Sequence, residues 1–249
     1  MPTPSTGDGL AEDLDAEHVG MMIKQVVALI SVVYVLFQKK KLPRPLTRLA
    51  ARFYFWPTIP ITISRLRMVP PHEYWSDVDA TLLVGGAPLP PPLASHVSRL
   101  SELGVTGVVN MCDEYGGPLA AYSDARIAQL RLPTVDHFEP SVRDLRRAVK
   151  FIDARSRRGE RVLVHCKAGH GRSAAVALCW LLHRRPDASL SSLAADLGAR
   201  RKVRKTLAQQ PNVQAFAKRR RRGKPRTVDG HSDRSSDPSG EDSSDSKRS

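Results

Sequence analysis

Cys166 and Arg172 are the residues of this sequence best suited to chemistry, and five residues separate them. An apolar run, 162–164, leads through His165 into the cysteine, and a second apolar run begins after Arg172 and Ser173. Such an order, with a glycine-containing loop between the two runs, is typical of a strand, a loop and a helix. We therefore expect Cys166 at the end of a strand and Arg172 at the beginning of a helix.

The loop between these two residues is the candidate binding site for an anion. Backbone N–H groups of a short loop before a helix converge on one point, where the helix N-terminus adds partial positive charge. These donors and Arg172 favour a thiolate, so the pKa of Cys166 should fall well below the free value of ~8.5 and the sulfur should become a nucleophile. Arg172 offers a planar fork for two oxygens of a phosphoryl group. The expected binding residues are Lys167, Ala168, Gly169, His170, Gly171 and Arg172, and the two glycines should adopt backbone conformations closed to larger residues.

The flanking residues His165 and Ser173 suit the same chemistry. Ser173 can donate a hydrogen bond to the Cys166 thiolate. In a reaction that forms a covalent phosphocysteine, this donor would ease the departure of the sulfur when the phosphoryl group is released. Because successive side chains of a strand point to opposite faces, His165 should orient the loop from beneath rather than transfer protons. The motif His-Cys-x5-Arg-Ser resembles the signature of cysteine-dependent phosphatases. The alternative is a structural cysteine beside a phosphate-binding loop that does no chemistry.

When a phosphate monoester is cleaved, the departing alkoxide needs a proton donor. The segment 132–140 is the candidate for the loop that supplies this donor. It follows an expected strand, precedes an expected helix, and contains Asp136 and Glu139, of which we favour Asp136 as the general acid. Cys166 would attack phosphorus while Asp136 protonates the leaving oxygen. Asp136 would then activate the water that hydrolyses the phosphocysteine. This mechanism needs no cofactor, and the sequence has no Asp-rich or His-rich run typical of a metal site.

The composition bears on the cellular setting more than on the reaction. Three cysteines in 249 residues are too few for a disulfide framework, which favours a reducing compartment. The net charge of +14 suits either a nucleic acid, through counterion release, or an anionic membrane surface. A catalytically inactive module that binds phosphate or nucleic acid through the basic run 218–226 is the weaker hypothesis, because no aromatic stacking residues accompany that run.

Strands and helices alternate along the middle of the chain, which predicts an α/β domain with a mostly parallel sheet and helices on both sides. We expect strands at 81–84, 105–111, 127–132 and 162–165, and helices at 93–103, 141–155, 172–182, 190–197 and 212–217. The predicted organisation is an acidic disordered N-terminus (1–18, extending to about residue 20), a hydrophobic and aromatic-basic segment (19–71), a catalytic domain (72–218) and a disordered tail (219–249).

The stretch 19–37 is almost entirely apolar, close to the ~20 residues that a membrane-spanning helix needs. If it spans, the basic residues 39–41 place the following domain on the cytoplasmic or matrix side. The alternative is an uncleaved targeting or interfacial helix. The aromatic run 53–56 either lies in the headgroup zone or packs on the catalytic domain, and Pro57 and Pro60 should interrupt any helix there.

Four segments carry a closer resemblance: YWSDVDATLLVGGAPLP, VVNMCDEY, LPTVD and HCKAGHGRS. They are similar to the mitochondrial-type protein tyrosine phosphatases that act as phosphatidylglycerophosphate phosphatases, within the dual-specificity phosphatases. The resemblance implies the cysteine-phosphatase fold and removal of the terminal phosphate from phosphatidylglycerophosphate, with phosphoinositides or phosphoproteins as alternative substrates. It also implies an anionic phospholipid and a membrane surface as partners, and roles for Cys166, Arg172 and Asp136 as nucleophile, phosphate ligand and acid.

The sequence departs from this family pattern at three places. Asp113 and Gly116 differ from its usual Glu-Glu-Tyr-Glu segment, so the role of residues 113–115 stays open. His170 replaces a basic residue, which predicts a pH dependence near neutrality. Residues 1–45 have no clear counterpart, so a mitochondrial location is implied by the resemblance alone, and a plastid or an endomembrane remains an alternative.

Overall fold

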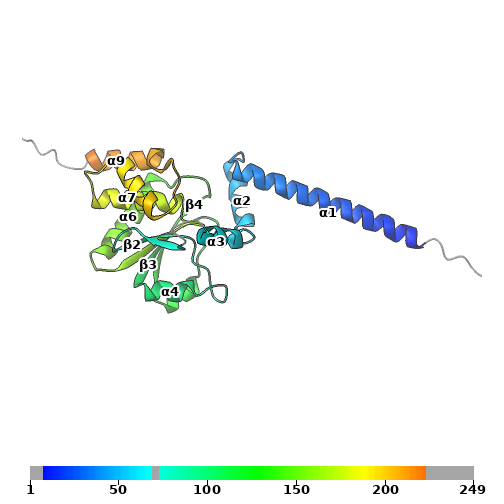
Figure 1. The fold of residues 1–249 in the computed structure, drawn as a ribbon, viewed down its shortest axis with the longest axis horizontal. Helices are drawn as coiled ribbons and strands as arrows, with labels where there is room; N and C mark the ends of the chain where they lie inside the picture. The colour runs from blue at the N-terminus through cyan, green and yellow to red at the C-terminus, as the bar shows by residue number, and fades with distance from the viewer. Residues whose placement is uncertain (1–7, 69–72, 223–249) are drawn as a thin grey trace, which may run out of the picture.

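A five-stranded sheet organises the computed structural model, which describes residues 8–68 and 73–222 (Figure 1). Its order is β1-β2-β5-β3-β4, and only β1 runs antiparallel to its neighbour. The predicted α/β fold with a mostly parallel sheet is therefore confirmed. The strands are β1 (Trp75–Asp77), β2 (Leu82–Gly85), β3 (Val105–Cys112), β4 (Ala128–Thr134) and β5 (Arg161–His165).

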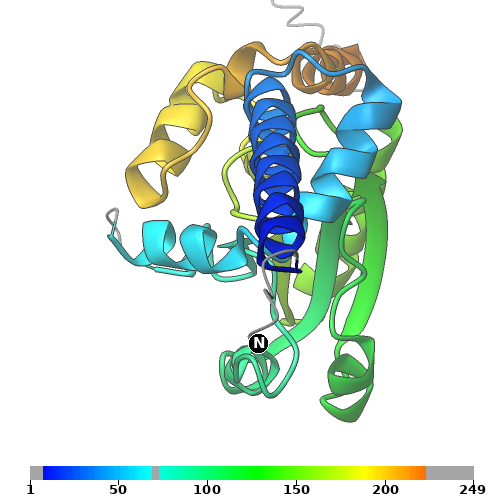
Figure 2. The same ribbon diagram turned by 90° about the vertical axis from the view of Figure 1, so that its right-hand side faces the viewer.

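Helices cover both faces of this sheet (Figures 1 and 2). The alternation along β5 shows how, since Val162 and Val164 enter the larger core beneath α6 and α7, whereas Leu163 enters a smaller core beneath α4 and α5. Because β5 is buried on both faces, its sequence is apolar without alternation. The helices are α4 (His96–Glu102), α5 (Leu119–Asp124), α6 (Val142–Ser156), α7 (Arg172–Arg184), α8 (Leu190–Arg200) and α9 (Pro211–Arg222), with a 3-10 turn, η1 (Leu207–Gln209), before α9.

Several element boundaries differ from those expected. The helix expected from residue 93 begins at His96, because three prolines at 90–92 precede it. Strand β4 continues through Pro133, which an edge strand tolerates since one side of its backbone forms no ladder. The short elements β1 and α5 were not expected, because each has too few residues to show a period.

The ends of the chain carry more helix than predicted. Helix α1 (Asp8–Gln38) includes residues 8–20, which we expected to be disordered. Its first residues are acidic, and negative charge is favoured at a helix N-terminus. Helix α9 includes residues 219–222 of the expected disordered tail, where Arg220 donates to the carbonyl of His183 at 3.0 Å. Residues 1–7 and 223–249 of the two expected disordered segments lie outside the described residues.

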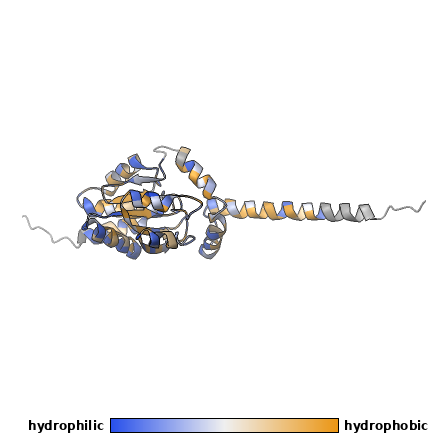
Figure 3. Ribbon diagram, turned by 90° about the horizontal axis from the view of Figure 1, so that it is seen from below, coloured by the Kyte–Doolittle hydropathy of each residue, from blue (hydrophilic) through white to orange (hydrophobic). Residues whose placement is uncertain are grey.

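Helix α1 projects away from the rest of the protein as one long rod (Figure 1). Within it, His18–Gln38 is a 21-residue stretch of mean hydropathy 2.1, long and apolar enough to cross a membrane, and none of its most apolar part is buried. Figure 3 shows that hydrophobic residues predominate in the half of α1 that is nearer the sheet.

Helices α2 (Arg44–Phe55) and α3 (Ile59–Met68) join α1 to the catalytic fold. They are separated at Pro57, as expected, whereas Pro60 stands in the first turn of α3, where proline is tolerated. The buried side chains of Phe55 and Ile59 belong to the main core. That core therefore extends upstream of the expected domain boundary at residue 72, which itself lies outside the described residues.

Candidate active site

The segment between β5 and α7 is a loop whose backbone wraps around one sulfur atom. The Cys166 Sγ accepts hydrogen bonds from the backbone N–H of Gly169 and from the Ser173 Oγ, both at 3.3 Å. Only 4% of Cys166 is exposed. The expected order of strand, loop and helix is confirmed, and it brings Cys166, Gly169 and Ser173 together as the spacing predicted.

The surroundings of Cys166 favour its charged form. Burial alone would raise the pKa of the thiol, but the Arg172 guanidinium and the hydrogen bond from Ser173 outweigh it, so that the pKa is lowered from its ordinary value of 9.0. The other two cysteines, Cys112 and Cys179, have pKa values that burial raises. Only Cys166 among the three therefore suits a nucleophile at neutral pH.

This difference predicts the pH dependence of alkylation. A lowered pKa means that the thiolate is populated at pH values where an ordinary thiol is still protonated, so iodoacetate should modify Cys166 at pH 6–7 faster than a free cysteine. The Ser173→Ala variant should shift the midpoint of the rate profile upward, because it removes a donor to the thiolate. Peptide mapping after modification gives the site, and a midpoint at or above that of free cysteine would contradict this assignment.

The carbonyl side of the loop is held by an arginine that sequence reasoning did not assign. The buried Arg201 donates to the carbonyl of Ala168 at 2.8 Å and to the carbonyl of Glu73 at 3.2 Å. Gly169 has a φ of 82°, and a Cβ there would lie 2.7 Å from the Arg201 guanidinium. Gly169 is thus required as expected, whereas Gly171 has a φ of −126°, which other residues adopt.

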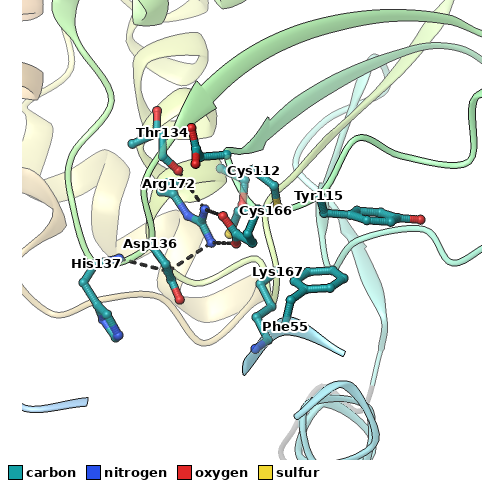
Figure 4. A network of polar contacts seen from close by, with 12 residues as sticks. Phe55, Cys112, Tyr115, Thr134, Asp136, His137, Cys166, Lys167 and Arg172 are labelled. Carbon is teal, nitrogen blue, oxygen red and sulfur yellow. Dashed lines mark hydrogen bonds and ion pairs between the residues drawn. The ribbon is translucent and has the colours of Figure 1, made fainter. Parts of the chain in front are cut away.

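Arg172 lies at the centre of the site, with its guanidinium held from several sides (Figure 4). Its two terminal nitrogens donate to the two oxygens of the Glu114 carboxylate at 2.8 and 2.7 Å, and one donates to the carbonyl of Thr134 at 2.9 Å. The Glu114 side chain is 1% exposed. This bidentate pair fixes the plane of the arginine fork. Glu114 is the main site residue that we did not assign from the sequence, where residues 113–115 were left open.

Neutralising Glu114 should weaken the site without removing any group that contacts phosphate. In Glu114→Gln the amide replaces one acceptor with a donor facing Arg172, so the guanidinium loses its fixed orientation. We expect kcat/KM to fall about tenfold or more through misplacement of the fork. Steady-state hydrolysis of 4-nitrophenyl phosphate measures this. Glu102→Gln, an exposed carboxylate paired with Arg99, is the matched control, and an equal effect of both changes would be inconsistent with this role.

The two carboxylates proposed for the acid loop lie in different places. Asp136 Oδ1 is 3.0 Å from an Arg172 nitrogen and accepts the backbone N–H of His137 at 2.9 Å. Glu139 instead accepts the backbone N–H of Asn212 at 3.4 Å, at the start of α9. Burial alone would raise the pKa of Asp136, but Arg172 and His137 lower it. Geometry thus places Asp136, and not Glu139, beside Arg172, the expected phosphate ligand.

Two further predicted site residues, Lys167 and His170, do not place a positive charge beside the sulfur. Lys167 directs its ammonium to Thr58 and to the carbonyl of Tyr54, at 3.3 Å from the latter. Burial, with Arg201 and Lys202 nearby, lowers the pKa of His170 to about 4, so the expected titration of His170 near neutrality is wrong.

His165 lies beneath the loop, fully buried. Its Nδ1 is 3.3 Å from the carbonyl oxygen of Cys166, and burial lowers its pKa to about 3. The imidazole is therefore neutral at physiological pH. A neutral ring under the loop suits the orienting role that we expected for this residue.

Comparison with known proteins agrees with this geometry. The family described as the catalytic domain of dual specificity phosphatases matches residues 92–211. A rat protein, phosphatidylglycerophosphatase and protein-tyrosine phosphatase 1, is 36% identical over 141 residues, which cover 53% of this chain and 71% of the relative. The chain belongs to this family of dual-specificity phosphatases.

Further relatives of the family are similar in sequence or in structure. Phosphatidylglycerophosphate phosphatase PTPMT2 of Arabidopsis thaliana is 35% identical over 60% of this chain. The chain spans 65% of that relative and 44% of the Arabidopsis PTPMT1 protein. A crystal structure of PTPMT1 in complex with PI(5)P superposes with a TM-score of 0.52 at 26% identity, covering 59% of this chain and 96% of that one.

Proposed function

We propose that this protein is a membrane-associated cysteine phosphatase that removes the terminal phosphate of phosphatidylglycerophosphate, a step toward phosphatidylglycerol and cardiolipin. The observation that carries the proposal is the meeting of Cys166, Arg172 and Asp136 at one site. The names of the relatives support this substrate, because both the plant and the rat proteins are called phosphatidylglycerophosphate phosphatases.

In the first step, the Cys166 thiolate attacks phosphorus and the bond to the leaving oxygen breaks. Arg172 and the N–H groups of the loop bind the phosphoryl oxygens, where negative charge develops in the transition state. Asp136 gives its proton to the leaving glycerol oxygen. In the unliganded site Arg172 keeps this carboxyl ionised. A bound phosphoryl group occupies the Arg172 donors and adds negative charge, and both effects raise the pKa of Asp136 so that it can hold the proton.

In the second step, water attacks the phosphocysteine. The Asp136 carboxylate takes a proton from this water, inorganic phosphate forms, and the sulfur leaves as a thiolate. Ser173 donates to the departing sulfur along the hydrogen bond that it already makes at 3.3 Å. His165 and Arg201 hold the loop from below and from the side. Apart from the substrate and this water, the two steps use only groups of the chain.

The chain organisation fits an enzyme that works on a bilayer. We propose that α1 inserts into the membrane, that the segment through α3 lies at its surface, and that the catalytic domain faces the reducing side, matrix or cytoplasm. The exposed apolar stretch His18–Gln38 and the lysines at 39–41 that follow it support this arrangement. The family resemblance of the sequence favours a mitochondrial location, with a plastid or an endomembrane as the alternative.

The substrate is tested by reconstituting the full chain into liposomes. Phosphate release from phosphatidylglycerophosphate should exceed that from PI(5)P and from a phosphotyrosine peptide by about tenfold or more in kcat/KM. The two competitors are chosen because a family structure contains PI(5)P and the rat relative is also named a protein-tyrosine phosphatase. Equal or reversed rates would replace the lipid proposal with a phosphoinositide or phosphoprotein phosphatase.

A further inference from the structure

The end of α1, helix α2 and the turn after it lie against the mouth of the active site. We call this element, residues 37–58, the N-terminal brace. Its side chains contact three separate segments around Cys166: the acid loop after β4, the segment 113–115 after β3, and the phosphate loop. Figure 4 shows part of this arrangement, with Phe55 of α2 beside Lys167 and Tyr115.

The acid loop is contacted at the two residues that follow Asp136. The Phe37 ring packs on the His137 ring edge to face, with 4.7 Å between centroids, and the Arg44 guanidinium lies 5.3 Å from the centre of the Phe138 ring. Phe37 is 3% exposed. His137 has a φ of 68°, an uncommon backbone conformation for a residue other than glycine, which persists where its surroundings hold it. Its backbone N–H is the group that orients the Asp136 carboxylate.

The segment after β3 is held by two arginines of the brace. Arg48 and Arg52 lie 2.9 and 3.3 Å from the two oxygens of Asp113, whose side chain is 7% exposed. Asp113 directly precedes Glu114, the carboxylate that fixes the Arg172 fork. This contact therefore stands one residue away from the phosphate-binding machinery.

The third contact reaches the phosphate loop itself. Phe55 stacks on Tyr115 with 4.8 Å between ring centroids, and the Lys167 ammonium lies 5.5 Å from the centre of the same Phe55 ring. Lys167 also donates to the hydroxyl of Thr58. The brace thus joins three loops that are far apart in the sequence, and it does so from the element that leads directly into the membrane helix α1.

We propose that the N-terminal brace positions the general acid: Phe37 and Arg44 hold the acid loop so that Asp136 reaches the leaving oxygen. Without them, Cys166 and Arg172 remain in place, because their partners Ser173, Gly169 and Glu114 all lie outside the brace. The inference rests on the proposed phosphatase reaction but not on its lipid substrate. It makes the membrane-proximal part of the chain a component of the catalytic geometry.

The dependence of the rate on the leaving group of the substrate tests this positioning role. A nitrophenolate departs without much help, whereas an alkoxide needs the proton of Asp136. In the full chain in detergent micelles, Phe37→Ala should lower kcat/KM, which reports the first step, about tenfold on butyl phosphate and less than about twofold on 4-nitrophenyl phosphate. Arg44→Ala should show the same pattern with a smaller loss, since a partly exposed cation–π contact is weaker. Leu46→Ala, at an exposed position of the same helix, is the matched control and should change neither rate.

A double-mutant cycle separates positioning from a general structural effect. In the Asp136→Asn background no proton donor remains to be positioned, so Phe37→Ala should cause no further loss on either substrate. Thermal unfolding of each variant shows whether the fold is intact.

A loss that is equal for the two substrates, a loss that persists in the Asp136→Asn background, or no loss at all would overturn the inference. If the liposome assay instead favoured a phosphotyrosine peptide, the lipid proposal would fail while the brace variants would still give the leaving-group pattern.

Discussion

Replacing Cys166 by serine should lower kcat on every phosphomonoester by about four orders of magnitude or more, because a serine hydroxyl in this loop stays protonated and is a poor nucleophile. The donors of the loop and of Arg172 are unchanged, so the variant should still bind inorganic phosphate. Phosphate release measures the first effect and titration calorimetry with phosphate the second. Loss of turnover with retained binding is the pattern of a removed nucleophile.

Cys179→Ala is the control for this variant. Cys179 is fully buried in α7, and burial raises its pKa, so it cannot act as a thiolate at neutral pH. Its replacement by a similarly small residue should leave kcat within about twofold. Turnover that survived in Cys166→Ser, or that disappeared in Cys179→Ala, would refute the assignment of the nucleophile.

Asp136→Asn should lower kcat/KM on alkyl phosphates by about 10²–10⁴-fold, the usual contribution of general acid catalysis. The loss on 4-nitrophenyl phosphate should be much smaller, because that leaving group needs little protonation. The asparagine keeps the size of the carboxyl group but cannot supply the proton. Comparison of kcat/KM for the two substrates measures the difference, because kcat/KM reports the first step, whereas kcat also contains the hydrolysis of the phosphocysteine, which is common to both substrates.

Glu139→Gln is the matched control, since Glu139 lies in the same loop and contacts the start of α9 rather than Arg172. It should leave the ratio of alkyl to aryl rates unchanged. A uniform loss for both substrates in Asp136→Asn would show that another residue is the general acid. A larger loss on the alkyl than on the aryl phosphate in Glu139→Gln would identify Glu139 as that residue.

The site residues that could be predicted from the sequence are those that lie close together in one local sequence pattern. The apolar run, the glycine of positive φ and the Arg-Ser pair place Cys166, Arg172 and Ser173 within one strand, loop and helix, so spacing alone determines their relation. Asp136 followed from the rule that loops after neighbouring parallel strands meet at one edge of the sheet. The rule led to the right loop although β4 is not a direct neighbour of the catalytic strand, because β3 lies between β5 and β4.

Residues that act from a distance were not predictable in this way. Glu114 meets Arg172 across 58 positions, and Arg201 meets Ala168 across 33. No period or motif links such pairs, although the position of Glu114 directly after a buried strand is a signal that could have found it. Arg201 was visible only as part of a basic patch. The tertiary fold decides which of several surface charges becomes buried.

Charge states and neighbours depend on burial, which a single sequence does not show. Partial burial beside Arg201 and Lys202 lowers the pKa of His170 to about 4, well below neutrality. In the aromatic run 53–56, Phe55 packs into the main core, which is one of the two alternatives that we left open. Phe53 and Trp56 are 60% and 48% exposed, and their location in a headgroup zone stays a prediction. An amphipathic pattern shows that one side of a helix is apolar, but it does not show whether protein or membrane covers that side.

The central claim is that the reaction passes through a phosphoryl group on Cys166, and trapping that intermediate tests it most directly. The Asp136→Asn variant should form the intermediate from 4-nitrophenyl phosphate faster than water removes it. Formation with this leaving group needs little help from Asp136, whereas hydrolysis of the phosphocysteine needs Asp136 as the base. After rapid mixing and denaturing quench, peptide mass spectrometry should find one phosphoryl group on Cys166 and none in the double variant with Cys166→Ser. A phosphoryl group on any other residue, or turnover with none trapped, would contradict the account.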